Sequence, residues 1–346
     1  MGITHLSGLE VAGVPTMGIG GAPLFTGNWY FVDAVNGNDG NTGAADSPLQ
    51  TIYGAYYKCT AGNNDVVVLV GNGSSSGTFR MSTALAQTID STATTGTVTW
   101  AKNATHLIGM TAPTGINSRA RFAPPTGTYT AATFGNSGNM FNVTATGCYF
   151  ANFSLFNGFS TGATGQICWK EAGGNNYYNA VSFGGMADAA SAGSATSRAV
   201  TVASSENTFV GCTFGLDTVT RTQANASLAF LVGTSRNKFV ECDFPIETSS
   251  ASAVAIYAAT ATLDRWEKFD RCTVLNNVLS SSTAMTGAVQ IGAASSPNGF
   301  ILLKDCSLVG CTNVAFDTTT EASLYVDGAA PTAATTGLAV ITASHG

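Results

Sequence analysis

The sequence predicts an all-β fold, a right-handed parallel β-helix that carries an extended N-terminal arm and a short capping helix. Three observations favour this solenoid. A short motif returns about every 30 residues, the motif is built from strand-forming residues, and only 10% of the 346 residues are charged, against a usual quarter. Repeats of this length stack along one axis, because a single repeat cannot bury its apolar face alone.

The repeat is clearest in two segments. Residues 207–214 read NTFVGCTF and residues 237–244 read NKFVECDF, which places Cys212 and Cys242 30 residues apart. Related segments continue the series in both directions. They lie at 148–155, 176–183, 267–274 and 301–308, with Phe153, Val181, Cys272 and Cys306 in the cysteine place.

Each motif is short, aromatic and β-branched, and it is bounded by Gly, Asn, Ser and Thr. This pattern predicts strands of two or three residues joined by bends, rather than the helices of ankyrin-like repeats. Coils of this length, stacked at about 4.8 Å, make a parallel β-helix. A connection between parallel strands of one sheet is right-handed in nearly all cases. The aligned positions predict a buried core ladder of Phe209, Cys212, Phe214, Phe239, Cys242, Phe244, Phe269 and Cys272.

Four regions follow one another along the chain. Residues 1–28 are expected to form an extended anchoring arm, because Gly and Pro are frequent there and the apolar residues have no helical or strand period. Residues 29–71 are expected to form the opening strand, a turn and a capping helix. Residues 72–320 are expected to form the β-helix coils, and residues 321–346 are expected to form a C-terminal cap or tail. The arm residues expected to bind a partner are Leu6, Leu9, Val11, Val14 and Met17.

The region after the arm contains the local signals of a cap. Residues 29–33 predict a strand, and the Asn, Gly and Asp residues of 36–41 predict a turn. Ser47 can cap a helix and Pro48 suits its first position, so a helix is expected to begin at Ser47. The apolar run at 65–71 predicts a buried strand, and residues 105–109 predict another.

The segment YFVDAVNGNDGNTGAADSPLQTIYGA, residues 30–55, is followed by DVVVLVG, residues 65–71. Together they resemble the opening segment of right-handed parallel β-helix proteins of the pectate-lyase-like superfold. That superfold includes polysaccharide lyases, glycoside hydrolases, phage tailspikes and non-catalytic phage virion proteins, so the resemblance implies a fold more than a function. The arm sequence HLSGLEVAGVPTMG, residues 5–18, is similar to arms of phage structural proteins encoded beside the major capsid protein.

Glycan cleavage in this superfold uses clustered acidic residues, and hydrolysis needs two carboxylates about 5 to 9 Å apart. The best candidate catalytic pair is Asp243 with Glu267 or Asp270, and it is the alternative to a protein without catalytic residues. The charged side chains favour instead a row of ion pairs on a solvated face. The repeat register places them in outward columns, with Glu241, Arg271 and Asp305 in one and Asp270 beside Lys304 in another.

The eight cysteines and three histidines have no metal-ligand spacing, so no metal and no cofactor is expected. Four of the cysteines lie in the repeat, where stacked neighbours come within disulfide range. We interpret them as small buried apolar residues, because Val181 fills the same place in another coil. His106 has no Ser or Cys partner at a recognisable spacing, and the turn at 36–41 lacks the alternation of a calcium loop.

The net charge is −6, and the 14 Lys and Arg residues are scattered along the chain. Nucleic-acid binding needs clustered cations, so no nucleic-acid partner is expected. No apolar run approaches the roughly 18 residues of a membrane span, so no membrane contact is expected. The N-terminus also lacks the basic and apolar regions of a secretory signal.

Two function classes remain. The first is a non-enzymatic phage virion structural protein, a capsid decoration or cement protein whose arm binds the major capsid protein or other virion proteins. The small residues of 250–261 leave little charge on the coil surface, which favours a homotrimer, located in the virion after assembly in the host cytoplasm. The alternative is a tailspike-type glycan depolymerase, a receptor-binding polysaccharide hydrolase or lyase. The sparse charge favours the first class.

Overall fold

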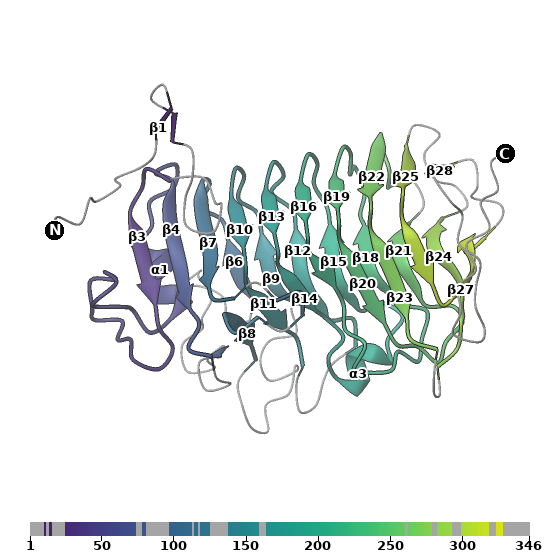
Figure 1. Cartoon of the computed structure of the whole chain (residues 1–346), viewed down its shortest axis with the longest axis horizontal. Helices are drawn as coiled ribbons and strands as arrows, with labels where there is room; N and C mark the ends of the chain where they lie inside the picture. The colour runs from purple at the N-terminus through teal and green to yellow at the C-terminus, as the bar shows by residue number, and fades with distance from the viewer. Residues whose placement is uncertain are drawn as a thin grey trace.

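The chain forms a right-handed parallel β-helix in which each complete coil contributes one strand to each of three sheets (Figure 1). Strands of successive coils pair in parallel, and β3 and β28 extend the first sheet by one strand at each end. The computed structural model describes residues 10–11, 14–15, 25–73, 78–80, 97–112, 114–116, 118–124, 138–158, 164–259, 262–278, 282–292, 299–317 and 323–327.

We number the sheets in the order in which the chain visits them in each coil. The first sheet contains β3 (Trp29–Val32), β4 (Asp65–Val70), β7 (Thr105–Met110), β10 (Tyr149–Ala151), β13 (Tyr177–Asn179), β16 (Thr208–Val210), β19 (Lys238–Val240), β22 (Trp266–Asp270), β25 (Phe300–Lys304) and β28 (Leu324–Asp327). The second contains β5 (Phe79–Arg80), β8 (Arg121–Ala123), β11 (Ser154–Phe156), β14 (Ser182–Gly184), β17 (Thr213–Phe214), β20 (Asp243–Ile246), β23 (Thr273–Asn276) and β26 (Ser307–Val309). The third contains β6 (Val98–Trp100), β9 (Asn139–Val143), β12 (Ile167–Glu171), β15 (Arg198–Val202), β18 (Ala226–Phe230), β21 (Val254–Ala258), β24 (Met285–Ile291) and β27 (Cys311–Ala315).

Aromatic side chains fill the inside of the coil in stacked columns. Phe209 and Phe239 are paired in register on β16 and β19, and their rings stack at 4.8 Å between centroids. Phe239 stacks in turn on Phe269 of the next coil at 4.5 Å. On the second sheet, Phe214 and Phe244 stack at 4.9 Å. All five side chains are fully buried, so the repeat motif supplies the core.

The cysteines of the repeat lie at the corner between the first and second sheets. Cys212, Cys242 and Cys272 are buried, and all eight cysteines of the chain are free thiols. The Cys242 Sγ lies 3.6 Å from the carbonyl oxygen of Phe209 in the preceding coil. Val181 is buried at the same place on an earlier coil. The thiols therefore pack as small apolar groups.

One left-handed residue makes the corner before each of these positions. It turns the chain sharply from the first sheet to the second. Glycine adopts this conformation without strain, whereas the other residue types there accept a backbone cost. The corner residues, with φ between 50° and 58°, are Asn152, Ala180, Gly211, Glu241, Arg271 and Asp305.

The capping helix begins later than the sequence predicts. Helix α1 spans Ile52–Lys58, and its N-cap is Thr51, whose Oγ1 accepts the N–H of Gly54 at 3.0 Å. The Ser47 prediction was wrong because residues 47–50 run beside β3 instead, where Leu49 donates its N–H to Phe31 and forms a parallel bridge with Val32. The only other helix in the described residues is α3 (Ala189–Ala192).

The arm contains two very short strands, β1 (Glu10–Val11) and β2 (Val14–Pro15), which pair antiparallel with Val11 opposite Val14. Figure 1 shows β1 apart from the coils, at the N-terminal end of the solenoid. The other predicted binding residues of the arm, Leu6, Leu9 and Met17, lie outside the described residues. Where the continuous description begins, the Phe25 ring stacks on His106 of β7 at 3.9 Å.

Candidate functional site

Asp270, at the end of β22, is bound by basic side chains. Its carboxylate lies 2.9 Å from the Lys268 Nζ, 2.8 Å from the Arg271 Nη1 and 4.0 Å from the Lys304 Nζ. The hydrogen bond from Lys268 and these charges hold the pKa of Asp270 below its usual range. Arg271 also pairs with Glu241 at 3.1 Å. The outward columns of the repeat therefore form a row of ion pairs.

Glu267 lies inside the coil, which differs from its proposed catalytic role. It ends a row of hydrogen bonds between stacked coils, in which each backbone N–H donates to a side chain one coil ahead. Asn176 donates to Asn207 at 3.0 Å, Asn207 to Asn237 at 2.9 Å, and Asn237 to the Glu267 Oε2 at 3.0 Å. Glu267 is fully buried, and burial raises its pKa to about 8. A polymer on the outer face has no access to this carboxyl.

Asp243, the third candidate, begins β20 on the outer face of the second sheet and is exposed. Burial of part of the carboxyl raises its pKa, and a hydrogen bond with Thr273 of the next coil opposes that effect. Asp270 belongs to the first sheet, across the corner, and Glu267 is interior. The fold thus places the three candidate carboxyls in three different environments rather than in one cluster.

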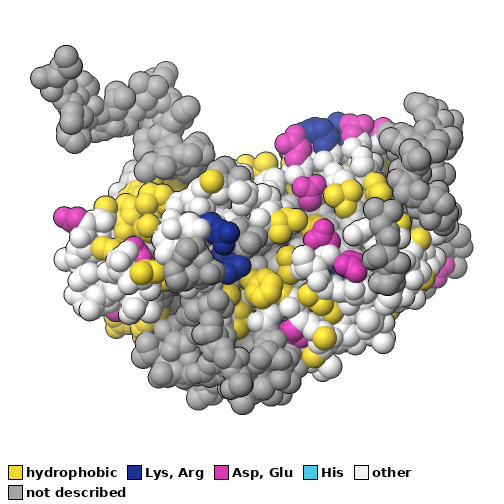
Figure 2. Space-filling model, turned by 60° about the horizontal axis from the view of Figure 1, so that its bottom comes forward, with side chains coloured by type: hydrophobic (Ala, Val, Ile, Leu, Met, Phe, Trp, Pro, Cys, Tyr) yellow, Lys and Arg dark blue, Asp and Glu magenta, His cyan; other side chains and the backbone are white. Residues whose placement is uncertain are grey.

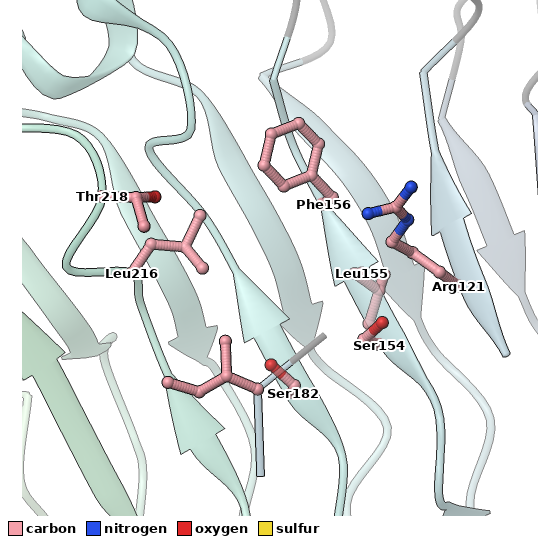
Figure 3. Close-up of a pocket in the computed structure, with 8 residues that line it drawn as sticks. Arg121, Ser154, Leu155, Phe156, Ser182, Leu216 and Thr218 are labelled. Atoms are coloured by element: carbon pink, nitrogen blue, oxygen red, sulfur yellow. The ribbon is translucent and has the colours of Figure 1, made fainter. Parts of the chain in front are cut away.

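The outer face of the second sheet holds a pocket of about 190 Å³ (Figure 3). It lies over strands β8, β11 and β14. Its walls combine a guanidinium group, an aromatic ring, aliphatic side chains and hydroxyl groups. The lining residues are Ile116, Arg121, Ser154, Leu155, Phe156, Ser182, Leu216 and Thr218.

The register of three strands builds the polar part of this pocket. Arg121, Ser154 and Ser182 are direct neighbours on β8, β11 and β14. Ser154 donates its hydroxyl to the carbonyl of Ser118 at 2.9 Å. The Arg121 Nη2 lies 3.1 Å from the Thr78 Oγ1, and its guanidinium carbon lies 6.0 Å from the centre of the Phe156 ring. The guanidinium is therefore held in place beside the ring.

Two glycines lie against the apolar part of the pocket. A Cβ on Gly158 would lie 2.6 Å from the Phe156 ring, so the ring rests directly on that backbone. A Cβ on Gly184 would lie 2.5 Å from the Leu155 carbonyl oxygen, and its distance to both Leu216 methyl groups, 3.5 Å, would be an ordinary contact. Leu216 itself is only 8% exposed. Because residue 158 is glycine, the Phe156 ring can lie directly against the backbone there.

Hydrophobic and charged side chains are mixed on the surface around the second sheet. Figure 2, which brings the bottom of Figure 1 forward, shows Lys and Arg side chains beside hydrophobic ones near the middle of this face, and acidic side chains on either side of them. Arg121 is the one charged residue among the described residues that line the pocket. The pocket can therefore bind a ring-shaped polar molecule, with its apolar face on Phe156 and its polar groups at Arg121, Ser154 and Ser182.

Sequence reasoning missed this pocket and the asparagine row. The row was visible, since Asn176, Asn207 and Asn237 occupy one place in aligned motifs. The pocket had a weaker signal, because Arg121 and Leu216 are far apart in the sequence and no shared motif contains them.

Neither a protein-family model nor a curated protein sequence matches this chain. Solved structures do match. A rhamnogalacturonan lyase aligns with a TM-score of 0.53 and 15% identity, over 83% of this chain and 69% of the lyase. A pectin methylesterase from Erwinia chrysanthemi aligns with a TM-score of 0.48 and 12% identity, over 92% of this chain and 85% of that one. The pectin methylesterase from Aspergillus niger aligns with a TM-score of 0.47 and 13% identity, over 92% of each chain.

The three parallel sheets and the likeness to the lyase together show the right-handed parallel β-helix fold. At these identities the likeness concerns the fold alone. Among the described residues, no helix is long and apolar enough to cross a membrane. The described His, Cys, Asp and Glu residues also form no group of three that could hold a metal ion.

Proposed function

We propose that this chain is a glycan-binding β-helix and that the pocket on the second sheet holds one sugar residue. The observation that carries the proposal is the combination, in one pocket, of the Phe156 ring, the Arg121 guanidinium and the hydroxyls of Ser154 and Ser182. A pyranose has an apolar C–H face and a rim of hydroxyls. An aromatic ring beside hydrogen-bonding groups matches both features.

The size of the pocket also suits a single sugar. Its volume is about 190 Å³, and an engineered cavity of about 150 Å³ holds one benzene molecule. A six-membered ring with substituents therefore fits, whereas a second ring has to lie outside. The fold gives general support, because the rhamnogalacturonan lyase that shares it is named for action on a polysaccharide.

The test is binding of the purified full-length chain to an array of mono- to octasaccharides from neutral and acidic polysaccharides. Phe156→Ala and Arg121→Gln should lower the signal on bound glycans at least tenfold. Tyr325→Ala removes an aromatic side chain of similar size that is 54% exposed and on a different sheet, and it should leave binding unchanged. Circular dichroism confirms folding of each variant. A signal equal in wild type and Phe156→Ala on every glycan would show that this pocket binds no sugar.

We propose binding without cleavage. Asp270 is neutralised by basic neighbours and Glu267 is interior, so neither is suited to act as acid or base toward an external polymer. Incubation with capsular or lipopolysaccharide glycans should release no reducing ends. Release that is lost in Asp243→Asn or Asp270→Asn would instead favour a tailspike-type depolymerase.

A second candidate function is that of a phage capsid decoration protein. The observation that favours it is the position of the arm. Strand β1, which pairs with β2, lies apart from the coils (Figure 1), and Phe25 near the end of the arm stacks on His106. Such an arm can bind the major capsid protein or another virion protein. A homotrimer would present three arms at once, which raises avidity.

Deletion of residues 1–24 tests this second function and keeps Phe25 in place. The truncated protein should remain a trimer in light scattering but should fail to join phage particles. Decoration of particles at full occupancy by the truncated protein would exclude the arm as the anchor. A monomeric mass for the full-length chain would exclude the trimer.

A further inference from the structure

A segment of the chain crosses the outer face of the second sheet and forms one wall of the pocket. We call residues 114–116 and 118 the strap. At one end, Ser154 of β11 donates its hydroxyl to the carbonyl of Ser118 at 2.9 Å. At the other end, Thr213 of β17 donates its hydroxyl to the carbonyl of Gly115 at 2.6 Å. The strap therefore spans from β11 to β17, past β14 with the pocket residue Ser182.

The loop after β17 forms the facing wall, with Leu216 and Thr218. This loop packs closely against Arg221 and the backbone of the next coil. Gly215 has a φ of +106°, and a Cβ there would lie 2.5 Å from the Arg221 Nη2 and 3.1 Å from the Pro245 carbonyl oxygen. The Arg221 side chain is itself buried and bonded to the Ser227 hydroxyl at 2.9 Å. The facing wall therefore has little room to retreat toward the next coil.

The two walls meet at the C-terminal end of the pocket, because Thr213 holds the strap on the same strand from which the loop with Leu216 departs. Arg121 stands at the other end (Figure 3). A sugar inside a linear polymer needs two openings, one for each neighbouring sugar. A terminal sugar needs one.

We infer that the pocket receives the terminal sugar of a glycan, or a branch of one sugar, and rejects sugars within a linear chain. This inference rests on the proposed glycan-binding function and names the ligand class of the same pocket. The strap would be the element that determines this specificity, since it closes the side and the end along which a polymer would continue.

The test uses array glycans in matched pairs. In each pair, one oligosaccharide has a free non-reducing end and the other has that end capped by a bulky ether. Wild type should bind the free form at least tenfold better than the capped form. Equal binding to both forms would overturn the terminal-sugar inference and leave the glycan-binding function intact. No binding to any glycan above the Phe156→Ala signal would reject the function itself.

A variant isolates the role of the strap. Thr213→Val keeps the shape of the side chain and removes the hydroxyl that holds Gly115. It should reduce the preference for free ends to within about twofold, because the strap can then move aside. Thr273→Val is the matched control, since Thr273 occupies the same register position two coils farther on. An unchanged preference in folded Thr213→Val would show that the strap is not the determinant.

Discussion

The row of asparagines inside the coil has a buried glutamate at each end, and the two glutamates have very different partners. Glu171 accepts the side-chain N–H of Asn176, and Glu267 accepts the backbone N–H of Asn237. Glu171 has further donors around both oxygens, whereas the Oε1 of Glu267 is buried with no hydrogen-bond partner among the residues that the structure describes. The further donors to Glu171 are the N–H groups of Gly173 and Gly174, both at 2.9 Å, and the hydroxyls of Ser204 and Tyr178.

This difference shows that burial alone does not determine what a carboxyl contributes to stability. Burial raises the pKa of both groups. At Glu171 the surrounding donors offset that cost, and the Ser204 hydroxyl ties the carboxylate to the next coil. At Glu267 fewer donors surround the carboxyl, with Asn237 the main one, and the cost of burial outweighs them. We therefore expect opposite responses to substitution at the two ends.

The largest effect is expected from Glu171→Leu. The substitution leaves the N–H groups of Gly173 and Gly174 and the Tyr178 hydroxyl buried without an acceptor. The free energy of unfolding should fall by about 3 to 5 kcal/mol, as measured by urea denaturation. Glu171→Gln, which keeps one acceptor oxygen, should lose less. A loss below about 1 kcal/mol in Glu171→Leu would mean that the donors find other acceptors.

Phe239→Ala should be nearly as costly, and it tests the stacked core between the two ends. Its ring contacts Phe209 and Phe269 above and below at 4.8 and 4.5 Å, so a cavity between two coils would result. The expected loss is about 3 to 5 kcal/mol in the same denaturation assay. Phe300→Ala is the comparison, because Phe300 lies on the outer face near Tyr325. Equal losses at the two positions would argue against a core built from the repeat.

Glu267→Gln should stabilise the protein at neutral pH and remove a pH dependence. In the folded protein the pKa of Glu267 is about 8, above the ordinary value of 4.5. The folded state therefore binds the proton more tightly than the unfolded state, and protonation of Glu267 stabilises the fold. Its contribution is complete below pH 4.5 and is lost as the pH rises toward 8. Wild type should therefore lose about 2 to 4 kcal/mol over this range through this group, relative to the variant.

The measurement is urea denaturation at several pH values between 4.5 and 8.5 for both proteins. Glu241→Gln provides the control, because Glu241 is an exposed partner of Arg271 and should change stability by less than about 1 kcal/mol. Parallel pH profiles of wild type and Glu267→Gln would show that Glu267 is ionised at little cost in the fold.

The same comparison explains what the sequence could predict. The interior was predictable because one coil returns at a nearly constant spacing, so that Phe209, Phe239 and Phe269 align in the sequence as they do in space. The outer surface has no such constraint. The pocket depends on a contact between Gly115 and Thr213, which are 98 residues apart, and on a loop with no counterpart in the repeat. Glu267 occupies a repeat position, but its residue type suggested an outward catalytic role.

Cys242→Val should change the free energy of unfolding least of all. Unlike the two glutamates, Cys242 is a buried group that carries no charge. Cys242 is fully buried midway along the cysteine column, where its Sγ lies 3.4 Å from the Val240 carbonyl oxygen. A thiol is a weak donor, and burial raises its pKa, so it remains a neutral group that mainly fills volume. Val181 is buried in the same column, which shows that this corner accommodates a valine. The free energy of unfolding should stay within about 1 kcal/mol of wild type in urea. A larger loss would show that the thiol of Cys242 contributes an interaction that a valine of similar size cannot replace.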